Sequence, residues 1–516
     1  MKRTRVLIAG LYGIENSGVR HVTAMLRERG GFDCDLLFFK DWRHNRVEWA
    51  SDGEVELFVD LVARKRYDVV GLGFGSPYYR VAIQLTDALR ARCPEVLIVW
   101  GGLHPTLVPE HCIAHADVVC VGEGEAPVLD LVERIERGEP YDDVGSLWVR
   151  HGETVIKNKV NELEQELDDL PFRHYGKDPQ DASVAILDHD ALTIGDPMLR
   201  HREYRIFCSR GCPYKCAYCY NSSLRAIYPE GRGNYHRRRS VANVMAELRQ
   251  ARERIPNLRW VKFDDDTFVF PKPWLQEFCA AYESEFAGLP FDVMMTPEVA
   301  TEDRLRLLKK AGLRGIQMGI EAGSDRESKE VYERNSTVKQ ILAFDKLNKE
   351  LGFDVKYDVI IDNPMSWRSD KDALFHLLTD LESDFKVYLY SLTLYPKSSV
   401  TEKMIAAGLA TEDDVEGIAT KSFRQFRVSV DWPRSHEDKY FLGLTMLACK
   451  PFVPKKVKRW FRETPFWEKH PDLLLEVAQG VNLVRMTGIA AKMASRGELS
   501  LQKVREYGNV RKMINQ

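Results

Sequence analysis

The chain has 516 residues, of which 44% are hydrophobic and 29% charged, and its formal net charge is −3. This length suits roughly three domains with sizeable cores, and the near-neutral charge gives no reason to expect a nucleic acid partner. No stretch of about 18 uncharged apolar residues is present, so we expect no membrane-spanning helix. The basic N-terminus lacks a small-residue cleavage site, and we interpret the apolar run after it as a buried strand. Cysteines outside residues 208–219 are scattered singly, which favours a cytoplasmic protein.

The first 140 residues alternate short apolar runs with amphipathic stretches. The runs predict buried strands at 4–11, 34–39, 68–75, 95–102 and 117–124. Strands that alternate with helices predict a parallel, doubly wound sheet, in which ligands bind beyond the carboxyl ends of the strands. Those ends are rich in glycine here (GLYG, GFGSP, GGLHP and GEGE), which predicts a site for a large ligand.

A second alternation begins at residue 204, after a polar stretch (141–200) that we interpret as an irregular connector. It predicts strands at 204–209, 258–263, 291–296, 315–320, 355–361 and 386–395. Six strand and helix units predict a partial, open β/α barrel over residues 201–400, with its chemistry at the carboxyl ends of the strands. Residues 401–516 predict a helical C-terminal region.

The segment CSRGCPYKCAYCYN (208–221) places Cys212, Cys216 and Cys219 in a C-x-x-x-C-x-x-C array. Thiolates are soft, charged ligands, and three so close together can hold one face of a 4Fe–4S cluster while one iron stays open. The alternative is a zinc knot, which would need a fourth Cys or His, commonly from a second pair. Cys208 ends an apolar strand, where we expect its side chain to face the core, and no second pair follows. The array therefore favours iron and sulfur over zinc.

An aromatic residue, Tyr218, precedes the third cysteine, and the array follows the first strand of the predicted barrel. In both respects the segment resembles the signature of the radical SAM superfamily. The resemblance implies that the open iron binds the amino and carboxylate groups of S-adenosylmethionine (SAM), and that reduction by one electron yields a 5′-deoxyadenosyl radical. The SAM-binding residues that it implies are Tyr218, Asp265, Asp266, Glu321 and Ser324.

Two of these segments also have a plainer interpretation. Adjacent acids at a strand end, as in FDDDTF (263–268), are costly without a cation to meet them, but a solvated turn that caps a helix is the alternative. MGIEAGSD (318–325) resembles the fourth-strand segment of a large radical SAM subgroup, and a helix-capping role is the alternative for Glu321. Asp362 and Asn363 stand where the family often has a glycine-rich turn, a departure that indicates a subgroup.

The region from VWGGLHP to VGEGE (99–125) resembles the cobalamin-binding domain that precedes the barrel in many radical SAM enzymes. The resemblance implies a flavodoxin-like domain over residues 1–140. The cobalamin-binding residues that it implies are Gly75, Ser76, Gly101, Gly102, Gly122, Glu123 and Gly124. None of the 13 histidines has a glycine three residues later, so the D-x-H-x-x-G axial ligand is missing. The alternative is a degenerate domain that kept the sheet and lost the corrin.

Together these features predict a cobalamin-dependent radical SAM enzyme whose cofactors are a 4Fe–4S cluster, SAM and cobalamin. The expected reaction methylates an unactivated carbon or phosphorus centre through a 5′-deoxyadenosyl radical and methylcobalamin. One alternative is a radical SAM enzyme of the same architecture that cyclises, oxidises or rearranges its substrate without methyl transfer. Another is a non-enzymatic cobalamin or iron–sulfur sensor.

The expected partners are a small-molecule or lipid-like substrate and an electron donor such as flavodoxin or ferredoxin. KPFVPKKVKRWFRETPFW (450–467) mixes basic and aromatic residues. It predicts either a solvated helix whose aromatic residues pack inward or a peripheral contact with an acidic membrane surface.

Overall fold

The computed structural model describes residues 3–41, 49–178, 180–200, 202–228, 233–415 and 434–481. The chain forms two compact units. The first comprises Met1–Pro213, Cys219–Lys262 and Leu394–Ser422, and the second comprises Tyr214–Tyr218, Phe263–Thr393 and Phe423–Gln516. The predicted boundaries at residues 140, 200 and 400 stay predictions.

The first unit contains a nine-stranded sheet with the order β7-β6-β5-β4-β3-β1-β2-β8-β9. From β5 to β8 in this order, neighbouring strands are parallel, and the outer pairs are antiparallel. The central order 5-4-3-1-2 confirms the predicted doubly wound, flavodoxin-like arrangement. The strands are β1 Arg5–Leu11, β2 Asp33–Phe39, β3 Val69–Gly73, β4 Leu97–Gly101, β5 Val118–Cys120, β6 Leu147–His151, β7 Thr154–Lys157, β8 Val184–Asp188 and β9 Ala191–Ile194.

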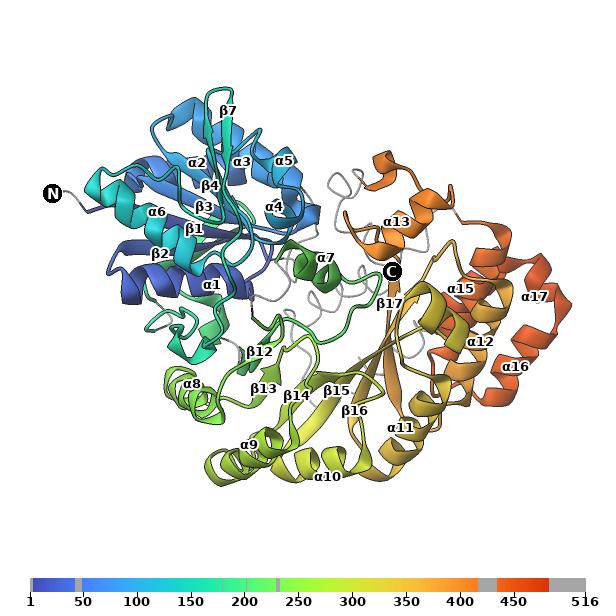
Figure 1. Cartoon of the computed structure of the whole chain (residues 1–516). Coiled ribbons are helices and arrows are strands. Elements are labelled where there is room, and N and C mark those ends of the chain that lie inside the picture. The colour runs from blue at the N-terminus through green and yellow to red at the C-terminus, as the bar shows by residue number, and fades with distance from the viewer. Residues whose placement is uncertain are drawn as a thin grey trace. The chain divides into compact units, whose positions relative to one another are not determined.

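Helices cover both faces of this sheet, with α1 and α6 together on one side and α2 and α3 together on the other (Figure 1). α2 begins at a capping box of Ser51 and Glu54, and α6 ends at Gly138, whose φ of 69° suits the left-handed position after a helix. The helices of this part are α1 Ser17–Ala24 with the π-turn Met25–Arg29, α2 Asp52–Lys65, α3 Tyr79–Arg92 after the 3₁₀ turn Ser76–Tyr78, α4 Leu103–Leu107, α5 Pro109–Cys112 and α6 Glu125–Arg137.

Residues 141–200, which we predicted to be irregular, contain strands that widen the sheet. β6 and β7 form a hairpin around Gly152, in which β6 pairs with β5 and β7 is the outer edge, while β8 and β9 extend the sheet beyond β2. The prediction was wrong because the outermost strands, β7 and β9, are short and unburied and so carry no long apolar run. β8 is different, since its run VAIL (184–187) is largely buried between β2 and β9 and could have marked a strand. The short 3₁₀ turns Leu167–Asp169 and Pro197–Arg200 also belong to this segment.

The second alternation of strands and helices is confirmed. In the second unit β14, β15, β16 and β17 pair in parallel in that order. Ser240 is the N-cap of α8, and its hydroxyl accepts the Asn243 N–H at 3.1 Å. The elements are β10 Glu203–Ile206, β11 Ser209–Arg210, α7 Tyr220–Ile227, β12 Arg237–Arg238, α8 Val241–Arg254, β13 Trp260–Phe263, α9 Lys272–Glu285, β14 Phe291–Met295, α10 Glu302–Ala311, β15 Leu313–Glu321, the π-turn Glu327–Val331, α11 Val338–Leu351, β16 Asp354–Ile361, α12 Arg368–Asp380 and β17 Phe385–Ser391.

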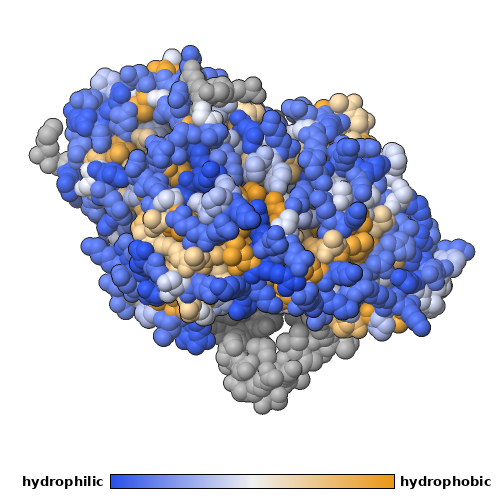
Figure 2. Space-filling model, turned by 60° about the horizontal axis from the view of Figure 1, so that its bottom comes forward, coloured by the Kyte–Doolittle hydropathy of each residue, from blue (hydrophilic) through white to orange (hydrophobic). Residues whose placement is uncertain are grey.

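The described part of the C-terminal region is helical, as expected. Its helices are α13 Ser399–Ala406, α15 His436–Ala448, α16 Lys455–Glu463 and α17 Pro465–Lys469. None of the described helices is long and apolar enough to cross a membrane. Hydrophilic residues cover most of the face shown in Figure 2, with apolar residues in limited groups between them.

A buried ion pair fixes the segment 141–200 to α1. Both Arg20 and Asp196 are almost fully buried, and two guanidinium nitrogens of Arg20 donate to the Asp196 carboxylate at 2.7 and 3.0 Å. Arg20 also donates to the carbonyls of Ile14 and His174, so its charge is fully surrounded by acceptors. A buried charge that keeps all its partners is tolerated, whereas one that loses its counterion is strongly destabilising.

We therefore expect Asp196→Asn to lower the free energy of unfolding by about 3–5 kcal/mol, because the Arg20 charge loses its counterion. The matched control is Asp130→Asn, which breaks a surface i,i+4 pair with Arg134 and should cost far less, because solvent screens such a pair. Urea unfolding of the two variants measures the difference. Equal losses would contradict the role given to the buried pair.

Candidate functional site

The predicted cluster cysteines lie in an irregular loop between β11 and α7. Cys212 is buried, and Cys216 and Cys219 are half-buried. Gly211 has a φ of 76°, and a Cβ there would lie 2.3 Å from the Tyr235 carbonyl oxygen. The array therefore begins at a position that only glycine can occupy without displacing its neighbour.

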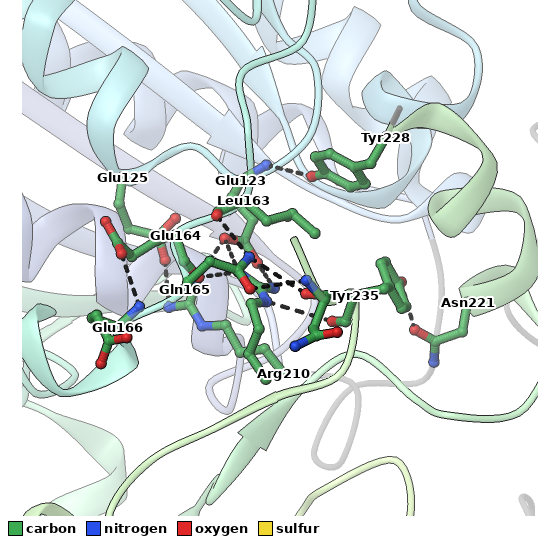
Figure 3. A network of polar contacts seen from close by, with 12 residues as sticks. Glu123, Glu125, Leu163, Glu164, Gln165, Glu166, Arg210, Asn221, Tyr228 and Tyr235 are labelled. Carbon is green, nitrogen blue, oxygen red and sulfur yellow. Dashed lines mark hydrogen bonds and ion pairs between the residues drawn. The ribbon is translucent and has the colours of Figure 1, made fainter. Parts of the chain in front are cut away.

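The first cysteine is held to α7. Arg225 on α7 donates to the Cys212 carbonyl, and its guanidinium carbon lies 4.9 Å from the centre of the Tyr235 ring. The Tyr235 hydroxyl in turn donates to Asn221 Oδ1 at 2.9 Å (Figure 3). These contacts fix the backbone around Cys212 through its carbonyl oxygen.

The thiols have the donor chemistry of a cluster site. Among the described residues, no group of three or more His, Cys, Asp or Glu side chains is gathered closely enough to share one metal ion. In a 4Fe–4S cube each thiolate binds a different iron, so its ligands stand further apart than those of a single ion. Cys208 is buried, in agreement with its predicted place in the core. The assignment of Cys212, Cys216 and Cys219 to a cluster stays a prediction.

Two predicted SAM residues, Tyr218 and Glu321, lie in one polar group with Arg334. Arg334 donates to the Tyr218 hydroxyl oxygen at 2.7 Å, and its Nη1 lies 3.4 Å from Glu321 Oε1. Glu321 ends β15 at a register shift against β16 and has a φ of 61°, in the left-handed region that non-glycine residues rarely occupy. Burial raises the pKa of the Glu321 carboxyl, and the Arg334 guanidinium acts against this rise. Strain of this kind is typical of a functional position.

Sequence reasoning missed Arg334, which places a cation beside the array. Burial raises the pKa of the Cys216 thiol, while the Arg334 guanidinium acts to lower it. The Ala217 N–H donates to the Tyr332 carbonyl at 2.9 Å, which holds the array against the segment that carries Arg334. The Nε of Arg334 has no hydrogen-bond partner among the residues that the structure describes. No local motif marks this arginine, and only its long-range contacts reveal it.

The other predicted SAM residues are not part of this group. Ser324 donates to Asp370 Oδ1 at 2.6 Å and accepts the Glu327 N–H at 3.1 Å, so its hydroxyl serves the turn after β15. Asp265 is fully buried and Asp266 is exposed, which places the two acids in different environments. A shared role for this pair is not supported, and SAM contacts by either acid or by Ser324 stay predictions.

The predicted cobalamin residues lie at the carboxyl edge of the first sheet. Gly75 and Ser76 follow β3, Gly101 ends β4 and Gly102 follows it, and residues 122–124 follow β5. This edge is where ligands bind in doubly wound folds. Gly102 has a φ of 100°, and a Cβ there would lie 2.8 Å from the Phe74 carbonyl oxygen, so this glycine is required by the fold itself.

His104 lies at the same edge and was not predicted. Its Nδ1 is 3.0 Å from the Ser76 hydroxyl oxygen, and its Nε2 is buried with no hydrogen-bond partner among the described residues. Burial lowers the pKa of His104 to about 4, so the ring is neutral near pH 7 and braces Ser76 as an uncharged group. GGLHP (101–105) contains this histidine, but no glycine follows it by three residues, so the D-x-H-x-x-G pattern does not mark it.

The carboxylate of Glu123 is paired with two arginines of the same chain. Arg237 donates to both Glu123 carboxylate oxygens at 2.6 and 3.0 Å, and Arg210 Nη1 lies 3.4 Å from the same carboxylate. The Glu123 N–H donates to the Tyr228 hydroxyl oxygen at 3.1 Å (Figure 3). Gly122 is confined by that same tyrosine, since a Cβ there would lie 2.6 Å from its hydroxyl oxygen. Direct cobalamin contacts by Gly122, Glu123 and Gly124 stay predictions.

The basic and aromatic segment 450–467 includes α16 and α17. Phe452, Trp460 and Phe466 are about half exposed, and Phe461 is buried, so the aromatic residues do not all pack inward. Arg459 pairs with Asp380 at 2.8 Å. The predicted contact of this segment with a membrane surface stays a prediction.

Two family models match the chain, one in each alternation. The B12 binding domain model matches residues 5–132, and the Radical SAM superfamily model matches residues 206–368. The first range spans β1 to β5, and the second contains the cysteine array and Glu321. Both resemblances drawn from the sequence are thereby confirmed.

The chain is also similar to individual proteins. An uncharacterized methyltransferase of Pyrococcus horikoshii is 26% identical over 345 residues, 66% of this chain and 70% of the relative. The structure of the radical SAM methyltransferase TsrM from Kitasatospora setae, with cobalamin and a [4Fe-4S] cluster bound, has a TM-score of 0.60 and 15% identity and covers 78% of both chains. That of the cobalamin-dependent SAM radical enzyme OxsB has a TM-score of 0.65 and 13% identity, and covers 99% of this chain and 83% of its own. The structural likenesses establish a shared fold.

The neutral state of His104 makes stability depend on pH. Its pKa in the folded chain, about 4, is below the ordinary value of 6.5, so the unfolded chain takes up a proton first as the pH falls. The loss begins near pH 6.5 and continues toward pH 4, and it amounts to about 2 kcal/mol between pH 7 and pH 5. Urea unfolding of wild type and His104→Gln at these two pH values should show a smaller decrease for the variant. The exposed His376 supplies the control, since His376→Gln should keep the wild-type decrease; an unchanged decrease in His104→Gln would refute the account.

Proposed function

Because the chain belongs to the radical SAM enzymes that carry an N-terminal B12 binding domain, we propose that it is a cobalamin-dependent methyltransferase. Its substrate would be a small molecule with an unactivated carbon or a phosphorus centre. The observation that carries the proposal is the presence of both domains in one chain, in this order, with the three-cysteine array at the start of the second. When bound, the cluster supplies the electron that cleaves SAM, and cobalamin supplies a methyl carrier.

The chain's own residues would hold and orient these groups. Cys212, Cys216 and Cys219 would ligate the cluster through their thiolates, which are soft ligands suited to iron. Arg334 would attract the SAM carboxylate, because its guanidinium stands beside Cys216 and keeps Nε as an unused donor. Tyr218, fixed by Arg334, would offer its ring to the adenine.

At the first sheet, Ser76 and the neutral His104 would form the polar part of the corrin edge. A Cβ at Gly75 or Gly101 would lie 3.8 or 3.7 Å from its nearest neighbour, so the fold itself does not require glycine there. The missing side chains would allow a flat ligand to approach the backbone closely. No described His stands in a D-x-H-x-x-G motif, and His104 Nε2 is enclosed by protein, so we propose that His104 is not a cobalt ligand.

The proposal is tested on the full chain, reconstituted without oxygen with iron, sulfide and hydroxocobalamin. We expect cobalt near one per chain, and 5′-deoxyadenosine and S-adenosylhomocysteine after SAM and a reductant such as dithionite or flavodoxin are added. An intact cluster with negligible cobalt would make methyl transfer through cobalamin wrong. Cluster and cobalt without any cleavage of SAM would favour the sensor, and 5′-deoxyadenosine without S-adenosylhomocysteine would favour the radical enzyme that transfers no methyl group.

The cluster assignment predicts that Cys216→Ala abolishes the visible absorbance of the 4Fe–4S cluster and the reductive cleavage of SAM. A cube held by only two thiolates loses one of its protein attachments and is not retained. Cys279→Ala is the control, since Cys279 is buried on α9 and is not part of the C-x-x-x-C-x-x-C array, so its loss should leave iron content unchanged. A full iron and absorbance signal in Cys216→Ala would refute the three-cysteine assignment.

The role given to Arg334 predicts weaker binding of SAM when its charge is removed. A hydrogen bond to a charged group contributes about 1.5–3 kcal/mol, so Arg334→Gln should raise the dissociation constant of SAM at least about tenfold. Equilibrium dialysis with cluster-loaded protein measures it. Arg334→Lys, which keeps the charge, should lose less, and Arg314→Gln at an exposed position of β15 should lose nothing. Unchanged affinity in Arg334→Gln, with the cluster present, would exclude this residue from the SAM site.

A further inference from the structure

Arg210 stands two residues before Cys212 and opposite another arginine. β11 pairs antiparallel with β12 so that Arg210 and Arg237 are direct partners in the register. Like charges placed opposite each other across two strands repel. Here Glu123 lies against both: Arg237 donates to its two carboxylate oxygens, and Arg210 Nη1 lies 3.4 Å from one of them. The turn after β5 therefore supplies the charge that allows β11 and β12 to pair.

A second acid of the same turn holds Arg210 more closely. Arg210 Nη2 donates to Glu125 Oε1 at 2.6 Å. Glu125 is the first residue of α6 and is only 8% exposed, and a carboxylate at this position is also favoured by the helix dipole. Arg210 thus pairs with the carboxylates of both Glu123 and Glu125. Figure 3 shows its side chain directed toward them. Charge-assisted bonds of this kind are directional as well as strong, so they transmit position.

The same turn is also hydrogen-bonded to the helix that follows the array. α7 begins directly after Cys219, and Tyr228, the residue that ends it, accepts the Glu123 N–H at 3.1 Å. The residues that flank the array on both sides are therefore bonded to residues 122–125. Any displacement of this turn at the carboxyl edge of the sheet must move the backbone before Cys212 and the helix after Cys219.

We propose that Arg210 is a positioning residue that couples the corrin edge of the first sheet to the cluster loop. Cobalamin bound at this edge fixes the position of the turn 122–125, and the ion pairs of Arg210 transmit that position to the backbone before Cys212. Coupling between two sites is reciprocal, so a bound cluster changes the affinity for cobalamin by the same factor by which cobalamin changes the affinity for the cluster. This inference rests on the proposed function, since it needs both cofactors.

The test measures the dissociation constant of hydroxocobalamin for the full chain with and without its cluster. In wild type we expect a difference of about fivefold or more, which is the lower end of ordinary coupling. Glu125→Gln keeps the shape of the side chain but removes its charge, and should reduce the difference to less than about twofold. The control is Glu133→Gln on the same helix, where an exposed pair with Arg137 is broken and the wild-type difference should remain.

A spectroscopic readout separates coupling from a general loss of structure. The Mössbauer spectrum of the cluster should change when hydroxocobalamin is added to wild type and should not change in Glu125→Gln. Arg210→Lys keeps a positive charge and should retain part of the effect, which serves as the conservative variant if Glu125→Gln does not fold.

Two results would overturn the coupling alone: equal affinities with and without cluster in wild type, or the full wild-type difference in both Glu125→Gln and Arg210→Lys. A wild-type chain that holds a cluster but binds no cobalamin would overturn the proposed methyl transfer as well as the coupling. The measurement therefore distinguishes failure of this inference from failure of the function on which it rests.

Discussion

A buried charge must be paired, and this constraint joins segments of the chain that are far apart in sequence. Arg20 pairs with Asp196 and so holds it against α1, and Glu123 pairs with Arg237 on β12, the strand beside β11, which precedes the cysteine array. Because removing one partner leaves an uncompensated charge in a poorly solvated place, each pair tolerates change only at both ends together. The positions of the candidate site residues follow from these pairs as much as from the strands that carry them.

The strands that could be predicted are those that the fold buries on both faces. β1 reads RVLIAGL and is buried along almost its whole length, so a continuous apolar run marks it in the sequence. β7 reads TVIK and has no buried residue, since it lies at the outer edge of the sheet and needs only a pairing partner. Edge strands of this kind owe their existence to the strand beside them, and that information is absent from their own residues.

The candidate site divides in the same way. Cys212, Cys216 and Cys219 could be predicted as cluster ligands because that prediction depends only on residue type and spacing within one loop. Arg210 and Arg334 were not found, because their importance comes from contacts with Glu125 and Glu321, which local spacing does not record. Residue type alone also leaves out internal partners: Glu123 was predicted as a ligand contact, and its carboxylate accepts hydrogen bonds from Arg237 of the same chain.

This dual use of residues bears on whether the first domain retains its corrin site. Gly102 and Gly122 are explained by backbone conformation and by contacts with Phe74 and Tyr228, so a domain that had lost the corrin would keep them as well. The ion pairs between residues 123–125 and Arg210 are different. Buried or partly buried ion pairs bring little net stability compared with apolar packing, so stability alone is a poor explanation for them. The charge and the location of these ion pairs are explained if the distance between the sheet edge and Cys212 must be fixed. Such a requirement exists only if the corrin site and the cluster site work together.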